Sequence, residues 1–207
     1  MQKKIIMNIR IRRDLRTLRS IIELPLDFFK SGQKNDNYIR KRNRIRKLKY
    51  KLGINCFVET GTFYGQTVNF AKDLFEEVYS IEIYSPLYEY NLESFKHVSN
   101  VNLLLGDSGT VFEKLLPKLE NKCIFWLDGH YSGSGTGKGE IVSPIIKEIR
   151  AIHKFHRSDN CILIDDFRLF GLESGYPSLE EVKFEILNIN KNYIIEIDSD
   201  CIVAYVK

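Results

Sequence analysis

The regular alternation of apolar, strand-length runs with helix-length segments constrains this sequence more than any other feature. Apolar runs occur at residues 55–59, 78–83, 101–105, 123–127, 161–165, 193–197 and 201–206. Helix-like segments lie between most of them, at about 65–76, 86–97, 109–119, 143–155 and 178–190. Such an alternation predicts an α/β fold, in which a mostly parallel sheet carries helices on both faces.

The last two apolar runs are connected differently from the others. Only Asp198, Ser199 and Asp200 separate them. A crossover between parallel strands needs a dozen or more residues, so this short connection predicts a hairpin. We therefore expect a sheet of seven strands in which the last strand is antiparallel to the rest.

The first quarter of the chain has a different charge from the remainder. Residues 1–51 contain 17 Lys and Arg against 4 Asp and Glu, whereas residues 52–207 contain 14 against 23. Apolar residues at helical spacing predict a first helix over 5–29, and a second basic helix follows over 38–52. We therefore expect a basic helical extension at residues 1–52 and an α/β domain at residues 53–207.

The cysteines and the hydropathy exclude several classes of protein. Each of the four cysteines opens an apolar run and none forms a CxxC pair, which favours buried thiols in a reducing compartment over a disulfide framework or a zinc site. The sequence has neither a run of about 18 apolar residues nor an uninterrupted signal core. We expect a cytoplasmic protein.

A glycine-containing turn follows the first predicted strand and leads into a helix. It reads Glu59-Thr60-Gly61-Thr62-Phe63-Tyr64-Gly65. Gly61 and Gly65 would let the backbone approach a ligand closely, and the following helix offers free amide groups. The GxxxG spacing differs from the GxGxxG pattern of dinucleotide binding, so hydride transfer with NAD is disfavoured. A plain turn between a strand and a helix remains the alternative.

Acidic residues follow several other predicted strands. Glu82 ends the second strand, about 20 residues after the glycine turn, where a carboxylate suits two ribose hydroxyls. Asp107 and Ser108 follow the third strand, Asp128 the fourth, and Asp165 with Asp166 the fifth. Because ligands of open α/β sheets bind beyond the carboxyl ends of the strands, we expect these side chains to converge on one site.

These segments, in this order and spacing, resemble the motifs of class I S-adenosyl-L-methionine-dependent methyltransferases. The resemblance covers roughly residues 53–207 and is closest to the metal-dependent O-methyltransferases of the catechol and the macrocin and mycinamicin sugar types. It implies a Rossmann-like fold. It also implies that Glu82 holds the ribose and that the other cofactor-binding residues are Glu59, Gly61, Phe63, Gly65, Thr67, Asp107, Ser108 and Asp128.

The resemblance further implies a magnesium ion, with Asp128, Asp165 and Asp166 as its ligands. Three hard oxygen ligands at two adjacent strand ends suit Mg²⁺, and without a cation three clustered carboxylates would repel one another. The alternative is that Asp166 caps the next element and Asp165 contacts only the cofactor. The metal would bind two neighbouring substrate hydroxyls and lower the pKa of the one to be methylated.

His130 is the candidate base that would take the hydroxyl proton, and with Asp128 it forms the predicted catalytic pair. The related enzymes place a Lys or His three residues after the metal-binding Asp, where this chain has Tyr131. The role of His130 is therefore a departure from the pattern, and a structural role is the alternative. The glycine-rich residues 132–140 fail the phosphate-loop template and predict a loop over the site.

Three functions agree with these features. The leading one is O-methylation of a sugar, a glycan or a small-molecule diol. The second is methylation of RNA bound by the basic helical extension at residues 1–52, called the basic arm below. This arm is poor in aromatic residues, however, and the α/β domain is acidic. The third is an assembly module that binds an anionic membrane surface, at the inner face of the membrane, or a protein partner through residues 5–29.

Overall fold

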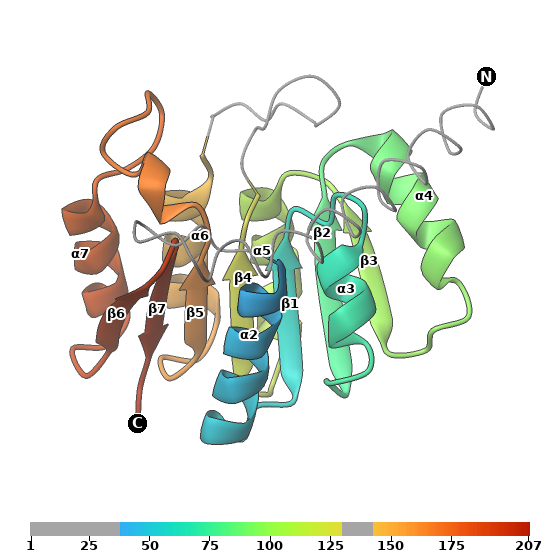
Figure 1. Ribbon diagram of the computed structural model, residues 1–207, viewed down its shortest axis with the longest axis horizontal. Coiled ribbons are helices and arrows are strands. Elements are labelled where there is room, and N and C mark those ends of the chain that lie inside the picture. The colour runs from blue at the N-terminus through green and yellow to red at the C-terminus, as the bar shows by residue number, and fades with distance from the viewer. Residues whose placement is uncertain (1–37, 130–142) are drawn as a thin grey trace, which may run out of the picture.

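A computed structural model describes residues 38–129 and 143–207 (Figure 1). Seven strands form one sheet in the order β3-β2-β1-β4-β5-β7-β6. The strands are β1 (Cys56–Thr60), β2 (Glu77–Glu82), β3 (Val101–Leu105), β4 (Cys123–Leu127), β5 (Cys161–Ile164), β6 (Ile194–Asp198) and β7 (Cys201–Tyr205). All pairings among β1 to β5 are parallel, whereas β7 runs antiparallel to both β5 and β6. The predicted α/β fold, with its antiparallel last strand, is confirmed.

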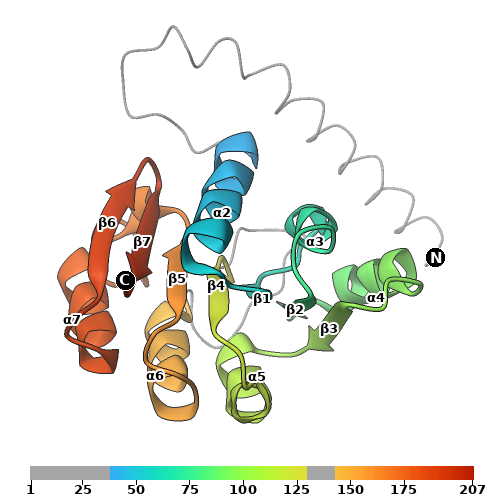
Figure 2. The same ribbon diagram turned by 90° about the horizontal axis from the view of Figure 1, so that it is seen from below.

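Helices cover both faces of the sheet (Figure 2). Those in the described part of the chain are α2 (Tyr38–Leu52), α3 (Gln66–Ala71), α4 (Ser85–Phe95), α5 (Ser108–Leu115), α6 (Ile145–Phe155) and α7 (Leu179–Ile189), with short 3-10 turns at Leu116–Lys118 and Phe167–Leu169. Helices α5, α6 and α7 pack on one face, while α2 and α3 pack on the other. Alternate residues of the central strands therefore enter two separate apolar cores.

The helix over residues 65–76 is shorter than its sequence pattern predicts. Helix α3 ends at Ala71 and a turn follows it. The side-chain amide of Asn100 donates hydrogen bonds of 2.8 Å to the carbonyl groups of both Lys72 and Phe75. Because a distant side chain satisfies these carbonyls, the segment needs no further helical turn.

Helix α2 packs directly against the sheet. Ile45 and Leu48 are buried in the core shared with α3. Arg44, also buried, donates from Nε to Asp198 Oδ2 at 2.9 Å and from Nη2 to the Asp198 carbonyl at 2.7 Å. Lys51 Nζ donates to the hydroxyl of Tyr205 at 2.8 Å. These contacts hold α2 on β4, β5 and the β6–β7 hairpin (Figure 1).

A conservative change at Ile45 tests whether α2 shares the stability of the α/β domain. We expect Ile45→Val to lower the free energy of unfolding by about 1 kcal/mol, because it deletes one methylene group from a fully buried position. Tyr50→Ala on the same helix is the control, since Tyr50 is 70% exposed and its loss should cost less than about 0.5 kcal/mol. Urea unfolding measures both, and equal midpoints would contradict the prediction.

The cysteines and the helix lengths complete the picture of the fold. All four cysteines, Cys56, Cys123, Cys161 and Cys201, are buried free thiols. This confirms that they act as small core residues. Among the helices formed by residues 38–129 and 143–207, none is both long and apolar enough to span a membrane. The predicted helix over 5–29 lies outside the described residues, and the boundary between residues 52 and 53 stays a prediction.

Candidate functional site

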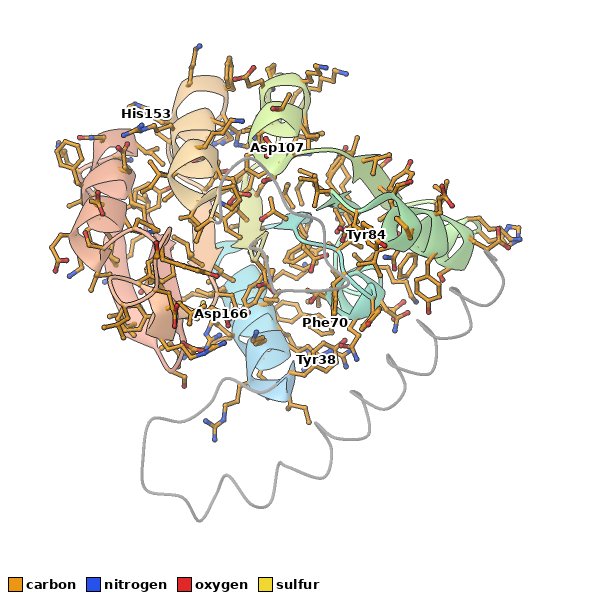
Figure 3. All side chains as sticks on the ribbon, turned by 90° about the horizontal axis from the view of Figure 1, so that it is seen from above. Tyr38, Phe70, Tyr84, Asp107, His153 and Asp166 are labelled. Carbon is orange, nitrogen blue, oxygen red and sulfur yellow. The ribbon has the colours of Figure 1, made fainter. Side chains whose placement is uncertain are left out.

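Those predicted site residues that fall within residues 38–129 and 143–207 lie around the carboxyl ends of β1 to β5. Figure 3 looks down on this edge of the sheet, where Tyr84, Asp107 and Asp166 come from three different loops. Strand alternation divides the site into two sides. Glu59 lies two residues after Phe57, and Asp165 two residues after Leu163. Both acids are therefore on the face of the sheet that packs against α2 and α3. Thr60 follows Val58 on the face that packs against α6.

The glycine turn lies against the end of β4. Gly61 has a φ of +84°, and a Cβ atom there would come within 2.6 Å of the carbonyl oxygen of Asp128. Gly65, with a φ of +70°, precedes α3, and a Cβ there would lie 2.3 Å from Asn91 Oδ1. Only glycine fits these two positions without movement of a neighbour. Phe63 between them also has a positive φ, of 49°, and such strain is typical of functional turns.

Glu59, at the start of the turn, is buried and belongs to a hydrogen-bonded network. Its Oε2 atom accepts a bond of 2.7 Å from Ser80 Oγ, which is itself 2.7 Å from Thr62 Oγ1. Burial raises the pKa of Glu59 to about 8, and nearby Asp128 adds to this rise, while hydrogen bonds from Ser80 and Thr67 oppose it. Thr67 of α3 is thus in contact with Glu59.

Glu82 links the end of β2 to the glycine turn. Its Oε2 accepts the backbone N–H of Phe63 at 2.8 Å, and its Oε1 accepts the N–H of Tyr84 at the same distance. The side chain is buried, and burial raises the pKa of Glu82 above its ordinary value in spite of these bonds. Each carboxylate oxygen retains a second lone pair, so both can accept from a diol while they hold the turn.

Asp107 and Ser108 begin α5 on the other side of the site. Asp107 is the N-cap, because its Oδ1 accepts the N–H of Thr110 at 3.1 Å, and it also binds Lys147 Nζ at 3.0 Å. Although burial opposes it, the contact with Lys147 lowers the pKa of Asp107. Ser108 Oγ donates to Glu148 Oε1.

Glu148 of α6 is a site residue that sequence reasoning missed. Its side chain is fully buried, and its Oε2 has no hydrogen-bond partner within residues 38–129 and 143–207. Burial raises the pKa of Glu148 to about 7, although hydrogen bonds from Ser108 and Thr60 oppose the rise. A signal was present in the sequence, because Glu148 lies on the same helical face as Ile145, Ile149 and Ile152, where an apolar residue is expected.

Asp165 is in contact with a lysine that comes from α2. Lys41 Nζ donates to Asp165 Oδ2, and the side chain of Asp165 is almost fully buried. Burial alone would lower the pKa of Lys41, but Asp165, Asp128 and Asp166 raise it above its ordinary value. Burial and the charge of Asp128 likewise raise the pKa of Asp165. Asp128 thus raises both pKa values, because its charge stabilises the ammonium of Lys41 and repels the carboxylate of Asp165.

Asp166 is in contact with an arginine. Its Oδ1 accepts from Arg168 Nη1 at 2.7 Å, and the same Nη1 donates to Asp200 Oδ2. Asp200 Oδ1 also accepts the backbone N–H of Arg168 at 2.7 Å. Asp166 has a left-handed backbone, with a φ of 56°, and its side chain makes no capping hydrogen bond to the following 3-10 turn. Asp166 therefore occupies the N-cap position of this turn, as the alternative reading expected, but without a capping bond from its side chain.

The three predicted magnesium ligands do not fit a metal site in this arrangement. Asp165 binds an ammonium group and Asp166 binds a guanidinium group. Within the described ranges, no group of three His, Cys, Asp or Glu side chains is placed to hold a metal ion. His130, the candidate base, and the loop 132–140 lie outside the described residues, so the role of His130 stays a prediction.

No protein-family model matches the sequence, and no curated protein sequence is similar to it. Solved structures do share its fold. An O-methyltransferase from Bacillus cereus in complex with SAH is 12% identical, with 91% of this chain and 90% of that chain covered and a TM-score of 0.59. An SAH-bound methyltransferase from Podospora anserina is 11% identical, with 91% and 87% covered and a TM-score of 0.56.

These likenesses confirm the fold that the sequence motifs imply. At 11–12% identity they extend over nearly the whole of each chain, which fits a shared sheet order and helix arrangement. Fold alone does not establish an activity, since one fold hosts many functions. The activity has to be argued from the geometry of the site.

Proposed function

We propose that this protein is an S-adenosyl-L-methionine-dependent methyltransferase that acts on a hydroxyl oxygen. The observation that supports this most strongly is the position of Glu82. A buried carboxylate at the end of β2 is bound to the backbone of the glycine turn after β1, at the place where a ribose diol can bridge the two. SAH, with which two structures of the same fold were solved, contains such a ribose.

The remaining residues would then contact different parts of the cofactor. Glu59, with Gly61, Phe63, Gly65 and Thr67, would surround the methionine part, where the buried Glu59 carboxyl offers a partner to the amino group. Asp107 and Ser108 would border the adenine from the start of α5. Asp128 would lie between the cofactor and the acceptor, because its backbone is in contact with the turn at Gly61 and Thr60.

Methyl transfer requires little covalent chemistry from the protein. The acceptor oxygen forms a bond to the methyl carbon while the carbon–sulfur bond breaks, and the electron pair stays on sulfur, which loses its positive charge. The hydroxyl proton leaves to a base, for which His130 is the candidate. The protein's contribution is alignment of oxygen, carbon and sulfur, so the rigid turn at Gly61 and the anchored strand ends are the relevant features.

The acceptor class is a hydroxyl compound, such as a sugar, a glycan or a small diol. The Bacillus cereus protein that shares this fold is an O-methyltransferase, which supports oxygen as the acceptor atom. Magnesium is not part of the proposal, because Lys41 and Arg168 bind two of its three predicted ligands. The RNA and membrane alternatives depend on the basic arm, most of which lies outside the described residues, and they stay predictions.

Cofactor binding tests the proposal without knowledge of the acceptor. We expect isothermal titration calorimetry to show one SAH bound per chain and no binding of NAD. Glu82→Gln should weaken SAH binding at least about tenfold, because the amide keeps only one of the two acceptor oxygens. The matched control is Glu77→Gln at the opposite end of β2, which should bind SAH as the wild type does. Absence of SAH binding by the wild type would refute the proposal.

A further inference from the structure

The part of the site around Asp128, Asp165 and Asp166, here called the acceptor end, is where the acceptor is proposed to bind. It contains a cation that belongs to the protein itself. Lys41 Nζ binds Asp165 Oδ2 and lies 5.6 Å from the ring centroid of Trp126, which is two residues before Asp128 on β4. The ammonium therefore lies between the ends of β4 and β5. That is the place at which Asp128, Asp165 and Asp166 would otherwise have to share a metal ion.

The position of this ammonium is fixed by the fold. Lys41 belongs to the first turns of α2, and the next turn of that helix is buried through Ile45 and bound to the β6–β7 hairpin through Arg44. Tyr38, one turn before Lys41, donates its hydroxyl to the backbone carbonyl of Gln66 at the start of α3. Contacts on both sides thus hold Lys41 over the strand ends.

Two further carboxylates beside the ammonium, Asp166 and Asp200, are also paired with a cation of the chain. Arg168 binds Asp166 and Asp200 together, and so ties the loop after β5 to the hairpin. A divalent cation at this place would lie next to one ammonium and one guanidinium group, and like charges at such short range repel strongly. Two of the three carboxylates would have to exchange a protein partner for the metal.

One buried acceptor is left in this cluster. Asp165 Oδ1 has no hydrogen-bond partner in the part of the chain that the structure describes, although Asp165 is only 2% exposed. A buried carboxylate oxygen without a donor is costly, so a donor from a ligand would stabilise it. A substrate hydroxyl could donate to Oδ1 while its oxygen lies near the ammonium of Lys41.

We propose that Lys41 takes the place of a divalent metal at the acceptor end, so that Lys41 and Asp165 together bind a single substrate hydroxyl. This inference rests on the proposed methyltransferase function and concerns which hydroxyl compounds can serve as its acceptor. A metal ion selects two neighbouring hydroxyls because it binds both of them. An ammonium paired with one carboxylate needs only one, so the acceptor need not be a vicinal diol.

Binding of Mn²⁺ alone, followed by electron paramagnetic resonance, tests the inference. We expect no stoichiometric Mn²⁺ binding by the wild type and one Mn²⁺ per chain for the double variant Lys41→Met/Arg168→Met, since loss of both cations leaves Asp165 and Asp166 available to a shared ion. The single variant Arg168→Met, which retains the ammonium of Lys41, should bind none. Lys41→Arg should resemble the wild type because it retains the charge. Lys47→Met, at an exposed position of the same helix, is the matched control and should also bind no Mn²⁺.

Two results would overturn the inference. One is a wild-type protein that binds one Mn²⁺ per chain and loses it on Asp165→Asn, because Lys41 would then be displaced by metal. The other is a folded Lys41→Met/Arg168→Met variant, checked by circular dichroism, that binds no Mn²⁺. The wild-type measurement shows whether metal displaces Lys41 even if the variant that lacks Lys41 does not fold. Binding of SAH by the wild type, measured separately, tests the proposed function independently of the role of Lys41.

Discussion

Gly61→Ala should weaken the binding of SAH by at least about 100-fold, or roughly 2.7 kcal/mol. The new Cβ would meet three backbone atoms, namely the carbonyl oxygen of Asp128 at 2.6 Å, its carbonyl carbon at 3.0 Å and the Cα of Gly129 at 3.3 Å. Backbone atoms cannot rotate away as a flexible side chain can. Either the turn or the end of β4 has to shift, and both border the proposed position of the cofactor.

Gly53→Ala is the matched control for this experiment. Gly53 also has a left-handed φ, of +64°, but a Cβ there would have no atom within 4 Å. Both variants therefore acquire the backbone strain, of about 1–2 kcal/mol, and only Gly61→Ala acquires the steric conflict. Calorimetry with SAH and urea unfolding separate the two effects. Equal SAH affinities for the two variants would contradict the placement of the cofactor at the glycine turn.

Glu148→Gln should make the protein more stable at pH 8 by about 3 kcal/mol, with little change at pH 5. The folded-state pKa of Glu148 is raised to about 7 from an ordinary value of 4.5. The folded protein therefore binds this proton more tightly than the unfolded chain does. The stability contributed by the proton is complete below pH 4.5 and is lost as the pH rises through 7, and glutamine removes this dependence.

Urea unfolding of both proteins between pH 5 and pH 8 measures the effect. The informative quantity is the difference in unfolding free energy between variant and wild type, because other buried acids such as Glu59 contribute equally to both. Glu113→Gln, at an exposed position of α5, is the control and should keep the wild-type pH profile. A constant difference for Glu148→Gln across this pH range would show that Glu148 does not titrate as its burial requires.

Local patterns in the sequence predicted most of the fold correctly. Seven strands were expected from apolar runs, and the antiparallel last strand followed from the three residues 198–200. Helix α3 was misjudged because its end depends on Asn100, which is about 25 residues away along the chain and donates to carbonyls that a longer helix would have used. Such a contact leaves no periodic signal near Ala71 itself.

The site was predicted in part. The acids at or just after the carboxyl ends of β1 to β5 were recognised because strand ends are visible as points where apolar runs stop. Lys41 was missed, since it is one of many basic residues in its segment and nothing in its spacing distinguishes it. Arg168 was missed for a similar reason, because its partner Asp200 lies 32 residues further along the chain.

The sequence by itself determined the order and type of the elements, and thereby the edge of the sheet at which the acidic residues meet. These properties follow from local hydrophobic periodicity and from the length of the connections. Only the tertiary structure decided the charge balance at that edge, because α2 folds back on the sheet and brings Lys41 to Asp165 across 124 residues of sequence. Along the chain the cluster of Asp128, Asp165 and Asp166 resembles a magnesium site, but in the folded protein Lys41 and Arg168 bind two of these three carboxylates.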